Sequence, residues 1–244
     1  MEDVINNMKN QIIIEMDMEI EDGLKLMRET QLRDEIYGYK INSLWVLERG
    51  INILHYCKEH FIGKKIILDM QKWGTDIPDI IKKQVEKVAP YVDELICCPM
   101  GAGSESLKMF AETCIDNNIK PICVLEMTHP ESDSYLETDQ IEKYKLPSYV
   151  YNILDDSIKY GIQDFVIPAT KEPRIGVKSM LSNWYPNEFK GTVNLYTTGL
   201  KVQGGQTKPM IDFGVTKFIV GRAVYEAENP IKAVEDIYKE INEV

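Results

Sequence analysis

The chain has 244 residues, and its hydrophobic content of 44% is enough for one sizeable packed core. The formal net charge of −11 argues against a nucleic-acid-binding protein, which usually presents a basic face. The five cysteines include no C-x-x-C pair, the sequence shows no signal-peptide pattern, and no apolar run approaches the roughly 18 residues that span a bilayer. These features predict a protein of the reducing cytoplasm with no membrane partner and no cysteine-bound metal.

Short apolar runs alternate with segments of helical periodicity along the whole chain. Strands are predicted at 11–17, 36–42, 65–70, 94–98, 120–127, 164–167, 193–196 and 217–220. Helices are predicted at 21–30, 44–60, 76–88, 104–118, 149–160, 174–184, after the glycine pair at 204–205, and at 229–243. About eight βα units without a linker predict a single (β/α)8 TIM barrel over residues 1–244. The long acidic connection at 129–146 is either a lid or an extended loop.

The stretch from Val193 to Tyr225 carries the most specific local pattern. Two apolar runs each stop abruptly, and they are followed by Gln203-Gly204-Gly205 and by Gly221-Arg222. At the last two strands of a barrel, such loops place backbone N–H groups, an amide and a guanidinium around one anion. We therefore predict a phosphate site there.

Other polar residues also follow predicted strands, where a barrel builds its active site. They are Asp17, Lys40, Asp69, Lys72, Asp76 and Thr128. Lys40 lies inside an apolar strand, which favours a buried, paired lysine over a surface one. Asp76 could equally cap the following helix, and Asp17 could be a turn residue.

Several of these segments together resemble the orotidine 5'-phosphate decarboxylase family, particularly its archaeal form, nearly from end to end. The matching segments are Met16-Asp17, Tyr39-Lys40-Ile41, Leu68-Asp69, Asp76-Ile77-Pro78, Glu126-Met127-Thr128-His129-Pro130, Phe165-Val166-Ile167-Pro168, Gln203-Gly204-Gly205 and Ile219-Val220-Gly221-Arg222-Ala223-Val224-Tyr225. The resemblance implies a TIM-barrel homodimer that decarboxylates orotidine 5'-monophosphate to UMP without metal or other cofactor.

The resemblance also assigns roles by position. Lys40, Asp69 and Lys72 belong to an alternating array of lysines and aspartates, and Asp76 completes the array of the partner subunit. The implied substrate-binding residues are Asp17 at the ribose, Thr128 and Pro168 at the pyrimidine, Gln203, Gly221 and Arg222 at the phosphate, and Ile77. An ammonium beside the reacting carbon stabilises the developing carbanion and then protonates it.

The chain departs from the family motif D-x-K-x-x-D. Here Asp69, Lys72 and Asp76 are spaced D-x-x-K-x-x-x-D, two residues longer. In a regular strand, residues two apart share a face, so Gln71 takes the lysine's position unless a bulge turns Lys72 inward. Two alternatives to the decarboxylase therefore stay open: a non-catalytic phosphate-binding paralogue, and a Mg²⁺-dependent decarboxylase or aldolase of sugar phosphates.

Overall fold

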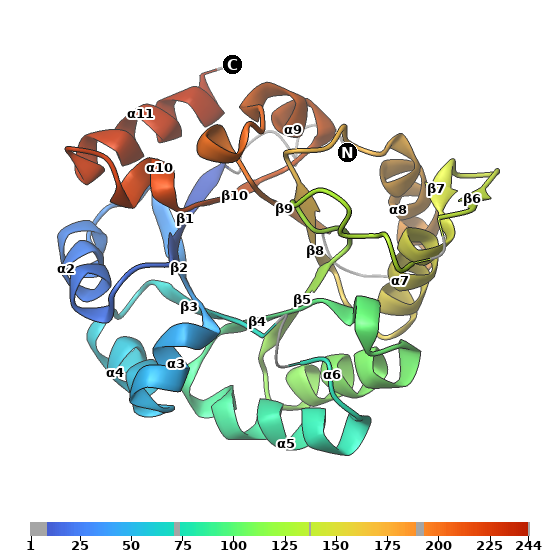
Figure 1. Cartoon of the computed structure of the whole chain (residues 1–244), viewed down its shortest axis with the longest axis horizontal. Helices are drawn as coiled ribbons and strands as arrows, with labels where there is room; N and C mark the ends of the chain where they lie inside the picture. Colours follow the sequence, from blue (N-terminus) through green and yellow to red (C-terminus); the bar gives the residue numbers. More distant parts are fainter. Residues whose placement is uncertain (1–8, 71–73, 137, 189–192, 244) are drawn as a thin grey trace.

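Eight parallel strands form one closed barrel in the computed structural model, which describes residues 9–70, 74–136, 138–188 and 193–243. The strands follow one another around the barrel as β1-β10-β9-β8-β5-β4-β3-β2 (Figure 1). Their bounds are β1 Gln11–Met16, β2 Ile36–Ile41, β3 Lys65–Asp69, β4 Glu94–Cys97, β5 Lys120–Val124, β8 Asp164–Pro168, β9 Asn194–Thr198 and β10 Lys217–Val220. The predicted TIM-barrel fold is confirmed.

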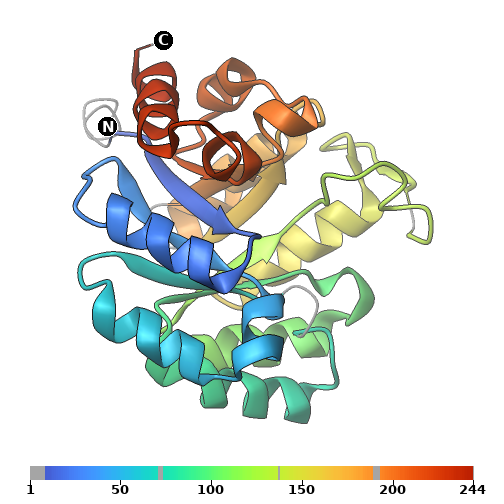
Figure 2. The same cartoon turned by 60° about the vertical axis from the view of Figure 1, so that its left-hand side comes forward.

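Helices cover the outside of the strand ring, as the side view in Figure 2 also shows. They are α2 Ile20–Thr30, α3 Ser43–Arg49, α4 Asn52–His60, α5 Pro78–Val88, α6 Ser104–Asp116, α7 Ser148–Lys159, α8 Ile175–Glu188, α9 Thr207–Phe213, α10 Arg222–Tyr225 and α11 Pro230–Asn242. The prediction of one helix over 44–60 is wrong. Gly50 adopts a φ of 66° there, which ends α3 and lets α4 begin in a new direction.

The acidic connection after β5 contains a small antiparallel pair, β6 Gln140–Ile141 and β7 Leu146–Pro147. Figure 1 shows this pair at the periphery, beside α7 and α8. The strand prediction at 120–127 ran too far, because β5 ends at Val124. Residues 125–128 instead form the start of a loop at the barrel mouth.

The barrel has two apolar layers. Side chains from β1, β3, β4, β5, β8, β9 and β10 fill the middle of the barrel, and they are Ile13, Ile67, Ile96, Ile122, Val124, Val166, Tyr196 and Ile219. A larger cluster joins the outer strand faces to the helices. This explains why the strands are apolar on both faces, since an all-parallel sheet is covered on both sides.

The amino-terminal end of the barrel interior contains a buried polar network. Glu94 is fully buried and accepts a hydrogen bond of 2.5 Å from Tyr37, while Lys120 lies 3.2 Å from the same carboxylate. Asp164 accepts from Tyr196 at 3.2 Å, and burial raises the pKa of Asp164 to about 6. These charged groups sit at the closed end of the barrel, so they serve the fold and leave the opposite end for a ligand.

Lys217 is a cation of this network whose charged form is disfavoured by burial. It is 4% exposed, donates to Gln11 Oε1 at 2.5 Å and lies 4.1 Å from the centre of the Tyr37 ring. Burial lowers its pKa from 10.5 to about 8. The folded-state pKa is thus below the unfolded value, so the charged lysine costs stability below pH 8, and this cost disappears as the pH rises through 8 toward 10.5.

Lys217→Met is therefore expected to raise the free energy of unfolding at pH 7 by about 1–3 kcal/mol, because methionine has a similar volume and carries no charge that must be buried. The stability difference between Lys217→Met and wild type should shrink toward pH 10.5. Urea unfolding of both proteins at pH 7 and at pH 10 measures this difference. Lys208→Met, at an exposed helix position, is the matched control. A Lys217→Met protein less stable than wild type at pH 7 would contradict the prediction.

Candidate active site

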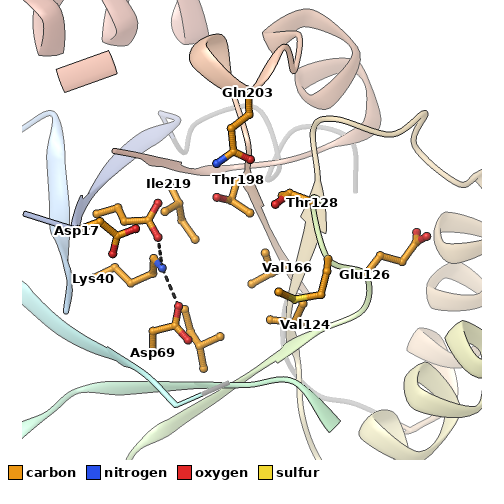
Figure 3. A pocket seen from close by; sticks show the side chains of 13 residues that line it. Asp17, Lys40, Asp69, Val124, Glu126, Thr128, Val166, Thr198, Gln203 and Ile219 are labelled. Carbon is orange, nitrogen blue, oxygen red and sulfur yellow. Dashed lines mark hydrogen bonds and ion pairs between the residues drawn. The ribbon is translucent and has the colours of Figure 1, made fainter. Parts of the chain in front are cut away.

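A cavity opens at the carboxyl ends of the strands. Figure 3 shows Asp17, Lys40 and Asp69 on one wall, Val124, Thr128 and Val166 on the facing wall, and Gln203 reaching in from above Thr198. The charged wall comes from β1, β2 and β3, and the opposite wall comes from β5 and β8. A bound molecule therefore meets charges on one side and apolar and hydroxyl groups on the other.

Lys40 is the centre of the charged wall. It is 5% exposed, and its Nζ forms an ion pair of 2.7 Å with Asp69 Oδ2 and a second ion pair with Glu15 Oε1. Burial alone would lower the pKa of Lys40, but the carboxylates of Asp69 and Glu15 outweigh it and raise the pKa above its ordinary value. Lys40 is therefore a permanent cation, and the interpretation of it as a buried, paired lysine is confirmed.

Strand register brings these three side chains together. Glu15 and Lys40 are direct partners across β1 and β2, and Lys40 pairs with Ile67 across β2 and β3. Asp69 lies two residues beyond Ile67 and hence on the same inward face. Side chains that are 25 and 29 residues apart in sequence thus surround one ammonium group.

Glu15 was missed by the sequence reasoning. It stands two residues before Asp17 on the same strand face, and that spacing was the signal that could have found it. Burial raises the pKa of Glu15, Lys40 opposes the rise, and the charges of Asp17 and Asp69 add to it. The charged wall thus holds three carboxylates around one described lysine.

Asp17 is exposed at the end of β1 and also lines the cavity. Its Oδ1 accepts a hydrogen bond of 2.5 Å from Asn42 Nδ2. Asn42 in turn caps α3 by accepting from the Leu44 amide, so this link joins the loops after β1 and β2. The carboxylate is held at the rim of the cavity, where hydroxyl groups of a ligand can reach it.

The facing wall is braced by a buried ion pair. Glu126 is 4% exposed, and Arg174 donates to both of its carboxylate oxygens at 2.7 and 2.8 Å. Thr170 donates to the Thr128 carbonyl at 2.9 Å. The loop that leads into α8 is therefore fastened to the loop after β5, which fixes the position of Thr128.

A second, smaller cavity adjoins the first. Gln203, Gly221 and Arg222 line it, together with Thr198 and Gly199. Gly199 has a φ of 84°, and a Cβ there would come within 3.0 Å of the Thr128 and Thr170 methyl groups. Only glycine lets the Gln203 loop pass so close to the facing wall.

The two cavities share lining residues, which are Glu15, Asp17, Thr198, Gln203 and Ile219. They therefore form one continuous site with a charged part and a part surrounded by Gln203 and the Gly221-Arg222 pair. The predicted phosphate loop and the predicted Lys40 and Asp69 pair are brought together at one end of the barrel.

Other predicted residues lie elsewhere. Pro168 is buried in β8 and is not among the described residues that line either cavity, whereas Thr198 on the neighbouring strand β9 lines both. Asp76 and Ile77 are exposed before α5; Ile77 occupies the N-cap position without a side-chain hydrogen bond, and the Asp76 carboxylate accepts from the Ile77 amide at 2.7 Å. Lys72, which the resemblance places in one array with Lys40 and Asp69, lies outside the described residues.

Within residues 9–70, 74–136, 138–188 and 193–243, no group of three or more His, Cys, Asp or Glu side chains is arranged to hold a metal ion. In the same residues, no helix combines the length and the apolar character that crossing a membrane requires.

Comparison with known proteins points to one family. The model of the orotidine 5'-phosphate decarboxylase / HUMPS family matches residues 10–237. The chain is 30% identical to orotidine 5'-phosphate decarboxylase of Methanosphaera stadtmanae over 241 residues, covering 96% of this chain and 99% of the relative. It is 28% identical to the enzyme of the same name from Pyrococcus abyssi over 231 residues, covering 94% and 98%.

Solved structures show the same fold. The crystal structure of orotidine 5'-monophosphate decarboxylase from Methanocaldococcus jannaschii, complexed with the inhibitor BMP, matches with a TM-score of 0.78 at 22% identity, covering 97% of this chain and all of that one. The enzyme from Pyrococcus horikoshii matches with a TM-score of 0.73 at 24% identity, covering 96% and 100%.

Proposed function

The chain belongs to the orotidine 5'-phosphate decarboxylase / HUMPS family, and from this premise we propose that it decarboxylates orotidine 5'-monophosphate to UMP in pyrimidine biosynthesis. One observation carries the proposal: the cavity of Lys40 and Asp69 is continuous with the cavity of Gln203 and Arg222. A nucleotide has its reacting ring at one end and its phosphate at the other, so it fits a site divided in this way.

The orotidine nucleotide is a better substrate for this site than a sugar phosphate. The wall opposite Lys40 combines apolar side chains, Val124 and Val166, with the hydroxyl of Thr128. A flat pyrimidine with polar edges matches such a wall. A sugar phosphate would leave the apolar part of the wall uncovered. The relatives that match over nearly the whole chain also bear the name of the decarboxylase.

The residues provide the chemistry that the reaction needs. When the bond between the ring and its carboxylate breaks, carbon dioxide leaves and the electron pair stays on the ring carbon. A lysine ammonium stabilises this charge and transfers a proton to the carbon, and we assign that step to Lys72. Lys40 orders the array by holding Asp69 at 2.7 Å, and Asp69 beside the substrate carboxylate disfavours the ground state.

The remaining roles follow the same assignment. We propose that Asp17 binds the ribose hydroxyls, that Thr128 contacts the pyrimidine, and that Gln203, Gly221 and Arg222 bind the phosphate; Pro168, which does not line the cavities, would act only from behind the pyrimidine wall. We also propose a cytoplasmic homodimer in which Asp76 and Ile77 reach the partner's site. Their exposure, 63% for Ile77, supports this arrangement because an apolar side chain at the surface gains from being covered.

A direct assay tests the proposal. Purified protein mixed with orotidine 5'-monophosphate is expected to remove the substrate's ultraviolet absorption band without added metal. A Lys40→Met protein prepared in parallel controls for contaminating enzyme from the expression host. If the protein binds UMP but does not turn over the substrate, the non-catalytic alternative is favoured, and Mg²⁺-dependent turnover of a sugar phosphate would favour the other.

A further inference from the structure

Glu15 is an additional carboxylate in the charged wall, outside the set of residues to which the family resemblance gives a role. It lies directly beside Lys40 across the strand pair, and its Oε1 forms an ion pair with the Lys40 ammonium. Lys40 is already held by Asp69. Lys40 therefore has two carboxylate partners, and Asp69 remains as one of them if Glu15 becomes neutral.

Glu15 also lies at the junction of the two cavities. It lines both of them, and its Oε2 lies 3.3 Å from the position that a Cβ on Gly221 would take. One carboxylate oxygen thus binds Lys40, while the other faces the turn where we place the phosphate. A ligand that occupies both cavities has to pass this side chain.

The groups that face Glu15 include both carboxylates and cations. They are Asp17 on its own strand, Lys40 on β2, Asp69 on β3, Arg222 and Tyr225 on α10, and the apolar Ile219 on β10. Burial, followed by the charges of Asp17 and Glu15, raises the pKa of Tyr225. Among these described groups, three carboxylates stand against two cations, Lys40 and Arg222, so the region carries a small net negative charge before any ligand arrives.

A phosphorylated ligand makes the imbalance larger. A phosphate monoester carries a charge of −1.5 to −2 at about pH 7. Arg222 can compensate part of it, but Glu15 Oε2 faces the same turn. An anion that comes close to a buried carboxylate favours the protonated form of the carboxyl group.

We propose that Glu15 takes up a proton from solvent when a phosphorylated nucleotide binds. The proton adds to a carboxylate oxygen, no bond of the ligand breaks, and the neutral carboxyl becomes a hydrogen-bond donor to the ligand. Lys40 then keeps Asp69 as its anionic partner. Glu15 thereby links nucleotide binding to pH and favours ligands that carry a phosphate. The inference rests on the proposed function, because it assumes a nucleotide in the site.

Calorimetric titration with UMP tests this linkage. Titrations in two buffers of different ionisation enthalpy at pH 7.5, where the phosphate itself is largely deprotonated, give the number of protons taken up. Wild type is expected to take up close to one proton per UMP, and its affinity should fall by up to about tenfold per pH unit above pH 7.5. Uridine, which lacks the phosphate, should bind with little proton uptake.

The variants isolate the residue. Glu15→Gln should bind UMP with no linked proton and with an affinity that no longer changes with pH in this range. Glu19→Gln, an exposed glutamate after the same strand, should behave like wild type. An infrared difference spectrum of the wild-type UMP complex should show a new protonated carboxyl band, which does not depend on whether Glu15→Gln folds.

The outcomes separate the two proposals. UMP binding to wild type without proton uptake would overturn the role of Glu15 and leave the decarboxylase assignment standing. Proton uptake that persists in a folded Glu15→Gln protein would also overturn it, because another group would then be responsible. Failure of wild type to bind UMP would overturn the proposed function and the linkage with it.

Discussion

Lys40→Met is expected to lower kcat/KM for orotidine 5'-monophosphate by at least about 10³-fold. Lys40 is the buried cation to which both Glu15 and Asp69 are paired. Without it the two carboxylates repel each other, and one of them should become protonated, which removes the ordered charge beside the substrate. Steady-state assays from pH 6 to pH 8 measure the effect.

Loss of a buried ion-pair partner also costs stability, about 3–5 kcal/mol where the remaining charge stays buried. The free energy of unfolding of Lys40→Met should therefore fall, and UMP binding with circular dichroism shows whether the protein is folded under the assay conditions. Lys65→Met, at the opposite end of the neighbouring strand, is the matched control, since its side chain is half exposed. A folded Lys40→Met protein within tenfold of wild-type kcat/KM would refute the assignment.

Lys72→Ala is expected to reduce kcat by about 10⁴-fold or more, while Gln71→Ala should stay within about tenfold of wild type. The expectation comes from charge: a cation is needed to stabilise the carbanion and to protonate it, and an amide can do neither. The lengthened spacing between Asp69 and Asp76 makes this pair of variants the decisive comparison. Single-turnover measurements separate the chemical step from product release.

The opposite order of activities for Lys72→Ala and Gln71→Ala would identify a different geometry. If Gln71→Ala removed activity and Lys72→Ala did not, the regular strand geometry would hold through residue 71 and the proton would have another source. If the wild type had no decarboxylase activity, and UMP bound equally well to the wild type and to both variants, the protein would be a nucleotide-binding paralogue. Substrate binding by Gln203 and Arg222 is expected to survive in each case.

The sequence alone was sufficient for the architecture. Unbroken apolar runs such as the one at Ile12–Ile14 predict strands covered on both faces, and their alternation with amphipathic segments predicts a barrel. The turns around Gln203 and Gly221 were also predictable, because glycines next to a polar side chain after a strand are a local signal. Local signals survive folding because backbone conformation at a glycine depends on nearby residues.

Tertiary structure decided which side chains meet. The sequence shows that Glu15 shares a strand face with Asp17, but the register between β1 and β2 is what sets Glu15 against Lys40. Likewise, Thr198 lines both cavities, whereas its register partner Pro168 lines neither. Residue periodicity determines the face of a strand, whereas register and barrel closure depend on contacts between distant segments, which no local pattern contains.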